Sequence, residues 1–111
     1  MNDRKLLENA AKAAGYDVCA EYFSGLVIRD GYKNERKWNP LTDDGDALRL
    51  AVRIKLSVMS FEKSVFVQSC PDSLLSFSDV DAMEMLDGSN DDEATRRTIV
   101  RVAAAIGEVM P

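Results

Sequence analysis

The sequence predicts an α+β fold, in which a mainly antiparallel sheet of about four strands has helices on both faces as an α/β/α sandwich. Three segments have apolar residues at helical spacing, and these are residues 3–14, 43 to about 55, and about 91–109. Between them lie short alternating or β-branched segments, which are residues 16–23, 26–29, 57–61 and 64–68. Short connections favour antiparallel pairing, and each helix has one apolar face to bury.

The first helix has recognisable signals at both ends. Asn2 or Asp3 can cap its first turn, and Gly15 stands where a C-terminal cap belongs. Its apolar positions recur at helical spacing and are Leu6, Leu7, Ala10, Ala11 and Ala14. We therefore expect a helix from Asp3 to Ala14.

The strand segments are separated by turn residues. Ser24-Gly25 and Asp30-Gly31 flank the strand at 26–29, and Glu62-Lys63 connects a hairpin. Residues 32–37 are polar and either extend a ribbon or form a loop. Residues 79–86 remain open between strand and helix, because Val80, Met83 and Leu86 fit either structure.

The central helix begins with an acidic cluster. Leu41-Thr42 leads into it, Thr42 is a good cap, and carboxylates in the first turn favour the positive end of the helix dipole. Those carboxylates belong to Asp43, Asp44 and Asp46. The remaining positions leave only a narrow polar stripe, so we expect this helix to be largely buried.

The last helix follows Asn90, which has capping-box spacing to Glu93. Its arginines lie mainly outside its apolar face. From the helical faces we expect six residues in the core, which are Leu6, Leu48, Val52, Ile99, Val102 and Ile106.

Length and composition indicate one globular domain over residues 1–111, with 46% hydrophobic residues and a formal net charge of −5. That negative charge repels phosphate backbones and disfavours nucleic-acid binding. Cys19 and Cys70 have no metal-like spacing, and so few cysteines are atypical of a small secreted chain. With no secretory signal or membrane span apparent, we expect a cytoplasmic protein.

Three segments together resemble a family of small phage and prophage proteins, the phage ABA sandwich domain. They begin Arg4-Lys5-Leu6-Leu7, Trp38-Asn39-Pro40-Leu41-Thr42-Asp43-Asp44-Gly45-Asp46, and Ala94-Thr95-Arg96-Arg97. The family name implies helices on both faces of a sheet, which agrees with the element order. The resemblance implies a location in the cytoplasm of a bacterial host cell, and it implies no catalytic residue.

The residues that could carry chemistry have simpler structural explanations. The chain has no histidine, which excludes Ser-His-Asp and Cys-His nucleophile systems and histidine metal ligation. Asp43, Asp44 and Asp46 could hold Mg²⁺ or Ca²⁺, but a helix start accounts for them, and the spacing does not fit a calcium loop. A second acidic cluster, Asp87 with Asp91, Asp92 and Glu93, is interpreted as a solvated loop and cap. We expect no cofactor and no metal.

Four residues are candidates for binding a partner, and these are Trp38, Arg96, Arg97 and Arg101. The arginines could form a phosphate-binding stripe, although exposed arginines are ordinary on an amphipathic helix. Trp38 either pins its loop to the core, the interpretation we favour, or serves as an exposed aromatic anchor. Both cysteines are interpreted as structural thiols.

Three hypotheses of function remain. The first is a non-enzymatic protein-interaction module, a phage accessory factor whose partner is an unknown host or phage protein. The second is a divalent-metal-dependent enzyme that uses the acidic clusters. The third is a nucleic-acid binder that uses the arginines of the last helix. The sequence names no partner and no oligomeric state.

Overall fold

The computed structural model describes residues 2–22, 25–29, 35–69, 81–85 and 90–110. It has three helices and six strands within these ranges. The helices are α1 (Asp3–Ala14), α2 (Asp44–Arg53) and α3 (Asp91–Val109). The strands are β1 (Asp17–Tyr22), β2 (Gly25–Arg29), β3 (Glu35–Trp38), β4 (Leu56–Ser60), β5 (Ser64–Ser69) and β6 (Asp81–Met85). The α+β class and antiparallel pairing are confirmed.

The strands form two separate sheets, not one sheet of about four strands. Sheet A has the order β1-β2-β3 and sheet B has the order β4-β5-β6, with every pair antiparallel. Residues 32–37, left open between ribbon and loop, include β3 from Glu35 onward. The ambiguous segment 79–86 contains a strand, β6, over its described residues.

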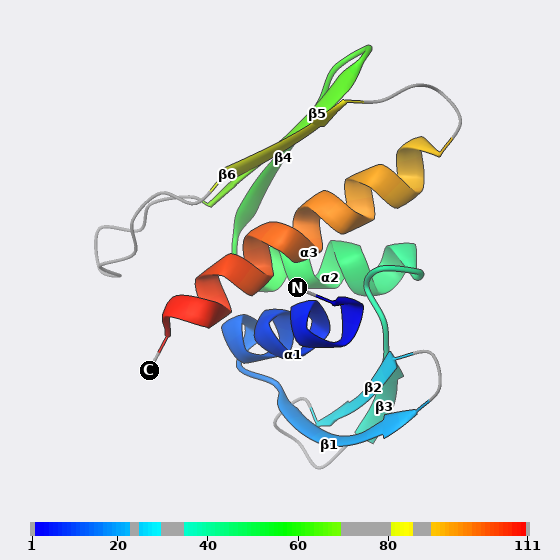
Figure 1. Cartoon of the computed structure of the whole chain (residues 1–111), viewed down its shortest axis with the longest axis vertical. Coiled ribbons are helices and arrows are strands. Elements are labelled where there is room, and N and C mark those ends of the chain that lie inside the picture. The colour runs from blue at the N-terminus through cyan, green and yellow to red at the C-terminus, as the bar shows by residue number, and fades with distance from the viewer. Residues whose placement is uncertain (1, 23–24, 30–34, 70–80, 86–89, 111) are drawn as a thin grey trace.

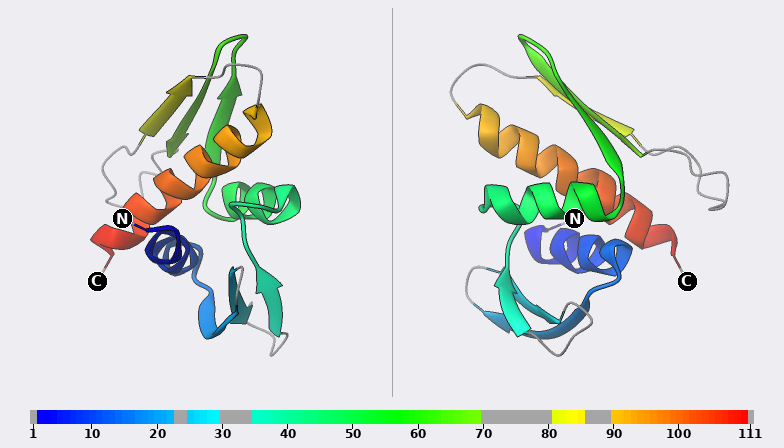
Figure 2. Two further views of the ribbon diagram at one scale, coloured as in Figure 1. Left: turned by 45° about the vertical axis from the view of Figure 1, so that its right-hand side comes forward. Right: turned by 180° about the vertical axis from the view of Figure 1, so that it is seen from behind.

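The order of layers differs from the expected α/β/α sandwich. Figure 1 shows sheet B above the helices and sheet A below them, so the helices lie between the two sheets. Helix α3 packs against β5 and β6, while α1 packs against β1 and β2 (Figure 2). Among the described elements, each sheet therefore has helices on one face only. The expectation of helices on both faces of one sheet is wrong, because the strand segments before and after α2 pair among themselves.

Local signals fix both ends of α1. The Asn2 side chain caps α1 by accepting a hydrogen bond from the Lys5 backbone N–H at 2.8 Å, and Gly15 ends it in the left-handed conformation at φ 77°. The bounds predicted for the first and last helices are confirmed. The Asn90 side chain makes no capping bond to the backbone of α3, and its amide donates instead to Glu93 Oε2 at 2.7 Å.

Helices α1 and α3 cross closely because small residues line the contact. A Cβ atom added at Gly107 would lie 1.9 Å from the backbone oxygen of Asn9, so only glycine fits there. Ala10 and Ala103 are fully buried nearby in the same core. The crossing packs the first and last helices of the chain together, and they form the centre between the two sheets (Figure 1).

The core confirms part of the predicted set. Ile99, Val102 and Ile106 are buried, and Leu6 is partly buried against the core. Leu48 and Val52 are instead 65% and 68% exposed. Helix α2 buries Ala47, Leu50 and Ala51 on its covered side, whereas Leu48 and Val52, four residues apart, lie on the opposite side. An apolar composition around a helix does not show which side a neighbour covers.

Candidate functional site

The segment between β3 and α2 forms a hydrogen-bonded turn around Asn39. Its side-chain oxygen accepts from the Leu41 backbone N–H at 3.0 Å, a local bond typical of asparagine in turns. Its backbone oxygen accepts from the N–H groups of Thr42 and Asp43 at 3.2 and 2.9 Å. The Trp-Asn-Pro-Leu-Thr-Asp-Asp segment thus has a structural purpose, which is to turn the chain from sheet A into α2.

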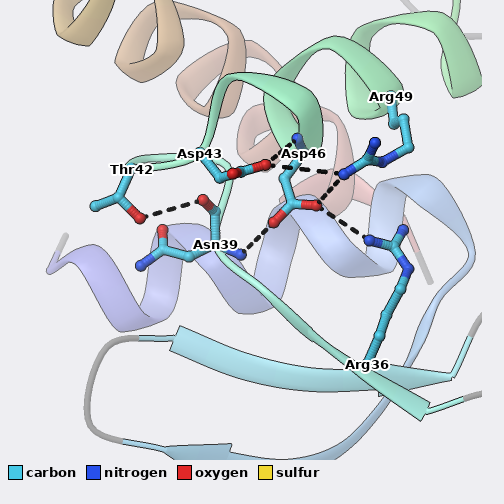
Figure 3. A network of polar contacts seen from close by, with 6 residues as sticks. All are labelled: Arg36, Asn39, Thr42, Asp43, Asp46 and Arg49. Carbon is cyan, nitrogen blue, oxygen red and sulfur yellow. Dashed lines mark hydrogen bonds and ion pairs between the residues drawn. The ribbon is translucent and has the colours of Figure 1, made fainter.

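Asp46 is the centre of a polar network that joins sheet A to α2 (Figure 3). It is only 6% exposed, and burial of a carboxylate requires compensating partners. Its Oδ1 accepts from Arg36 Nη1 at 3.0 Å and from Arg49 Nη2 at 2.8 Å, while Oδ2 accepts from the Asn39 backbone N–H at 3.0 Å. The hydrogen bond to Asp46 raises the pKa of Arg49.

The other two aspartates at the start of α2 also have structural partners. Asp43 is the N-cap, and its Oδ2 accepts from the Asp46 backbone N–H at 2.7 Å. Thr42, predicted to be the cap, lies one residue too early, and its hydroxyl is 3.5 Å from the Asn39 backbone oxygen. Asp44 Oδ1 accepts from Arg96 Nη1 at 2.5 Å. These contacts support the capping interpretation over metal binding.

No group of three or more metal-ligating side chains is found within the part of the chain that the structure describes. In the second acidic cluster, Asp91, Asp92 and Glu93 form the first turn of α3, where carboxylates favour the helix dipole. Asp87 lies outside the described residues, as does Cys70. Cys19 is an exposed free thiol on β1, at the point where the register with β2 shifts.

Trp38 is fully buried, at 0% exposure. Its ring packs edge-on against the ring of Tyr16, with the two centroids 5.8 Å apart and an angle of 76° between the ring planes. The guanidinium of Arg53 lies over the Tyr16 ring, 4.8 Å from its centroid. The indole Nε1 has no hydrogen-bond partner within the described structure. The structure therefore supports the interpretation that Trp38 pins the chain to the core, and an exposed anchor at this position is wrong.

The three candidate arginines of α3 each hold a different neighbouring element. Arg96 bonds Asp44 and the Leu41 backbone oxygen beside α2, with 2.9 Å from Nε to that oxygen. Arg97 Nη1 lies 3.2 Å from Asp3 Oδ1 on α1, and Arg101 Nη1 lies 3.1 Å from Glu84 Oε2 on β6. Because each guanidinium faces a carboxylate of the same chain, the three do not form a cationic stripe open to phosphate.

A surface pocket of about 480 Å³ lies between the start of α1, sheet A and the Asn39 turn. Leu7, Leu26 and Leu41 give it an apolar floor, and the ion pair between Arg4 and Glu21 closes one side. Its size is within the range of small-ligand pockets. Its lining residues provide no nucleophile paired with a base, so the pocket supports no catalytic assignment.

The outer face of sheet B has two neighbouring, largely apolar rows that sequence reasoning did not select. Val65 and Val67 are fully buried in the core beneath the sheet, so the alternate residues of β5 face away from α3. Cross-strand register places Met59 beside Phe66 and Phe66 beside Met83. A second row is Phe61, Ser64 and Met85, because the Phe61 N–H bonds the Ser64 oxygen and Ser64 pairs with Met85.

We call these six residues the sheet B patch, and they are Met59, Phe61, Ser64, Phe66, Met83 and Met85. Four of its five apolar side chains are large exposed hydrophobics, from 38% for Met59 to 68% for Met85. In the sequence, apolar residues stand two positions apart at 59 and 61 and again at 83 and 85. That alternation was the available signal, but it does not show which face of a sheet is covered.

No helix formed by the described residues is both long and apolar enough to cross a membrane. Comparison with family models, with curated proteins and with solved structures found no match to this chain.

Proposed function

We propose that this protein is a non-enzymatic protein-interaction module whose contact surface is the sheet B patch. The observation that carries the proposal is the exposure of Phe61, Met83 and Met85, each more than half accessible on one sheet face. Exposed apolar side chains scattered singly are ordinary, but a contiguous group on one face is typical of an interaction site. Methionine adds to this, because its flexible side chain adapts to a partner surface.

The positions of the other candidate groups favour this function over its two alternatives. A metal-dependent enzyme needs carboxylates free to coordinate, whereas Asp43 caps α2 and Asp46 holds two arginines and a backbone N–H. A nucleic-acid binder needs a basic surface, whereas Arg97 and Arg101 face carboxylates and the chain carries a net charge of −5. The sequence resemblance extends the proposal to a phage or prophage accessory role with a host or phage protein as partner.

Site-specific photo-crosslinking tests the proposal. A photoreactive phenylalanine analogue replaces Met83 in the patch or, as a control of similar exposure, Leu48 on α2. We expect protein adducts from position 83, far fewer from position 48, and loss of the position-83 adducts when Phe66→Glu is added. Equal labelling at both positions contradicts the assignment of the surface.

A turnover assay tests the alternative hypothesis that the protein is an enzyme. If the purified protein hydrolyses a nucleotide, nucleic acid or peptide, and Asp44→Ala or another single carboxylate substitution stops turnover without unfolding the protein, the module is an enzyme and the proposal is wrong.

A further inference from the structure

We propose that the occupant of the sheet B patch is a second copy of this chain, which packs face to face to form a two-fold symmetric, weak dimer. This inference rests on the proposed function, because it names the partner of the same surface. It is carried by four properties of the patch, which are its register, the sizes of its side chains, its charge and its area.

The register makes the patch complementary to itself. The row Met59–Phe66–Met83 and the row Phe61–Ser64–Met85 are two residues apart, or about 7 Å along the strands. Consider a two-fold axis that runs parallel to the rows, midway between the two rows and midway between the two facing sheets. This axis places each row of one copy opposite the other row of the second copy. Each copy then contributes the same contacts.

The sizes of the facing side chains match across that axis. Phe66, the large residue at the centre of one row, faces Ser64 of the second copy, whose small side chain leaves room for the ring. Met59 faces Phe61 of the second copy, so a sulfur atom and an aromatic ring meet at one edge of the contact, and Met83 faces Met85 at the other edge. Two facing sheets stacked about 10 Å apart form an ordinary β-sandwich.

Charge permits the contact between identical copies. Each chain carries −5, so two copies repel at long range, but neither row contains a charged residue. No like charges therefore meet inside the contact. Added salt screens the remaining repulsion, so the dimer is expected to tighten as ionic strength rises. A basic partner bound by charge would weaken under the same change.

The area fits a reversible dimer. From their exposed fractions, Met59, Phe61, Met83 and Met85 expose roughly 450 Å² together, within the range of patches that are often functional. With the surrounding polar rim, each copy buries about 600 Å², so the total lies at the low end of specific interfaces. We expect a dissociation constant on the order of 10–100 µM.

Sedimentation of the full chain over about 1 µM to 1 mM tests the dimer. Met83→Glu and Phe66→Glu should each weaken dimerisation at least about tenfold, because a charge would be buried in the contact. Leu48→Glu is the matched control, since Leu48 is 65% and Met83 61% exposed, and its dimer should be unchanged. Circular dichroism confirms that each variant is folded. A dimer that persists in both patch variants overturns the proposal.

Cysteine crosslinking tests the register. In a background with Cys19→Ser and Cys70→Ser, a short bismaleimide links Met83→Cys chains mixed with Met85→Cys chains. The proposed axis predicts that the mixed dimer exceeds both dimers of a single variant. More linking within either single-variant sample overturns this register.

The failures of the two proposals are distinguishable. A chain that is monomeric at every concentration but still gives Phe66-dependent adducts with other proteins at position 83 disproves the second copy and leaves the interaction module in place. A monomer without such adducts contradicts both.

Discussion

Sheets A and B have the same number of strands and the same antiparallel pairing, but their outer faces differ. In sheet A, register aligns Asp17, Arg29 and Glu35 across the three strands, and Arg29 pairs with Glu35 at 2.9 Å. That hydrogen bond raises the pKa of Arg29. In sheet B two neighbouring rows on the outer face form the patch, whose side chains are methionines and phenylalanines except for Ser64. An outer sheet face in contact with water is normally polar. The charged row of sheet A is therefore typical of a solvent-exposed face, whereas the patch on sheet B is not.

The two sheets also differ in how their inner faces are attached. Sheet A buries Trp38 and Ile28 completely and is joined to α2 through Asp46. Sheet B is held by Val65 and Val67 and by the exposed ion pair of Arg101 with Glu84. Directional contacts between buried groups thus position sheet A, whereas apolar packing positions sheet B. The comparison predicts that substitutions in the two sheets have effects of very different size.

The largest effect is expected at Trp38. Trp38→Ala should lower the free energy of unfolding by about 3–5 kcal/mol, because it leaves a cavity where a fully buried ring was. Urea unfolding measures this. It is followed by circular dichroism and not by tryptophan fluorescence, because the substitution removes Trp38, the sole tryptophan of the chain. Met83→Ala on the outer face of sheet B should cost less than about 0.5 kcal/mol. Equal losses at both positions would remove the distinction between the sheets.

The next effect concerns the polar attachment of sheet A. Asp46→Ala leaves the Asn39 N–H, Arg36 and Arg49 without this acceptor, and should cost about 2–3 kcal/mol in the same unfolding experiment. Asp44→Ala is the matched control, because its carboxylate is exposed and should contribute less than about 1 kcal/mol. A larger loss at Asp44 would mean that the network does not hold the sheet.

A smaller effect distinguishes the two candidate caps of α2. Asp43→Ala should destabilise by about 1 kcal/mol, because it removes the acceptor for the Asp46 N–H. Thr42→Ala should cost only a few tenths, since that hydroxyl makes a single long contact of 3.5 Å. The reverse order, measured from denaturation midpoints, would restore Thr42 as the cap.

The smallest effect is expected at the ion pair that joins sheet B to α3. Arg101→Ala should change the unfolding free energy by no more than about 0.5 kcal/mol, because both side chains are more than 40% exposed. The loss should shrink further in about 0.5 M salt. A loss comparable to that of Asp46→Ala would show that sheet B is also held by polar contacts.

Local patterns were sufficient for the helices and most strands. The bounds of α1 and α3 follow from periodicity with cap and turn residues such as Gly15, signals contained within a few residues of chain. The hairpin of β4 and β5 follows from alternation around Glu62-Lys63 in the same way. Residues 79–86 could not be assigned, since an apolar period over so few residues fits both a strand and a helix.

The candidate site was predicted less well than the fold. The acidic residues at the start of α2 were correctly assigned to the helix start, because capping is a local interaction. The arginines of α3 were identified as polar positions, but their carboxylate partners lie 17 to 94 residues away in sequence. The sheet B patch was missed because an alternating strand has two faces and the sequence does not mark the covered one.

The sequence by itself determined the bounds of α1 and α3, the strands β1, β2, β4 and β5 and the cap of α1 at Gly15, because these depend on residues close together in the chain. Only the tertiary structure decided that the strands form two sheets with the helices between them, and that Trp38 is buried while Leu48 and Val52 are exposed. The physical reason is that burial depends on which neighbour covers a face. That neighbour is selected by packing between distant segments, such as the close approach of Gly107 to Asn9.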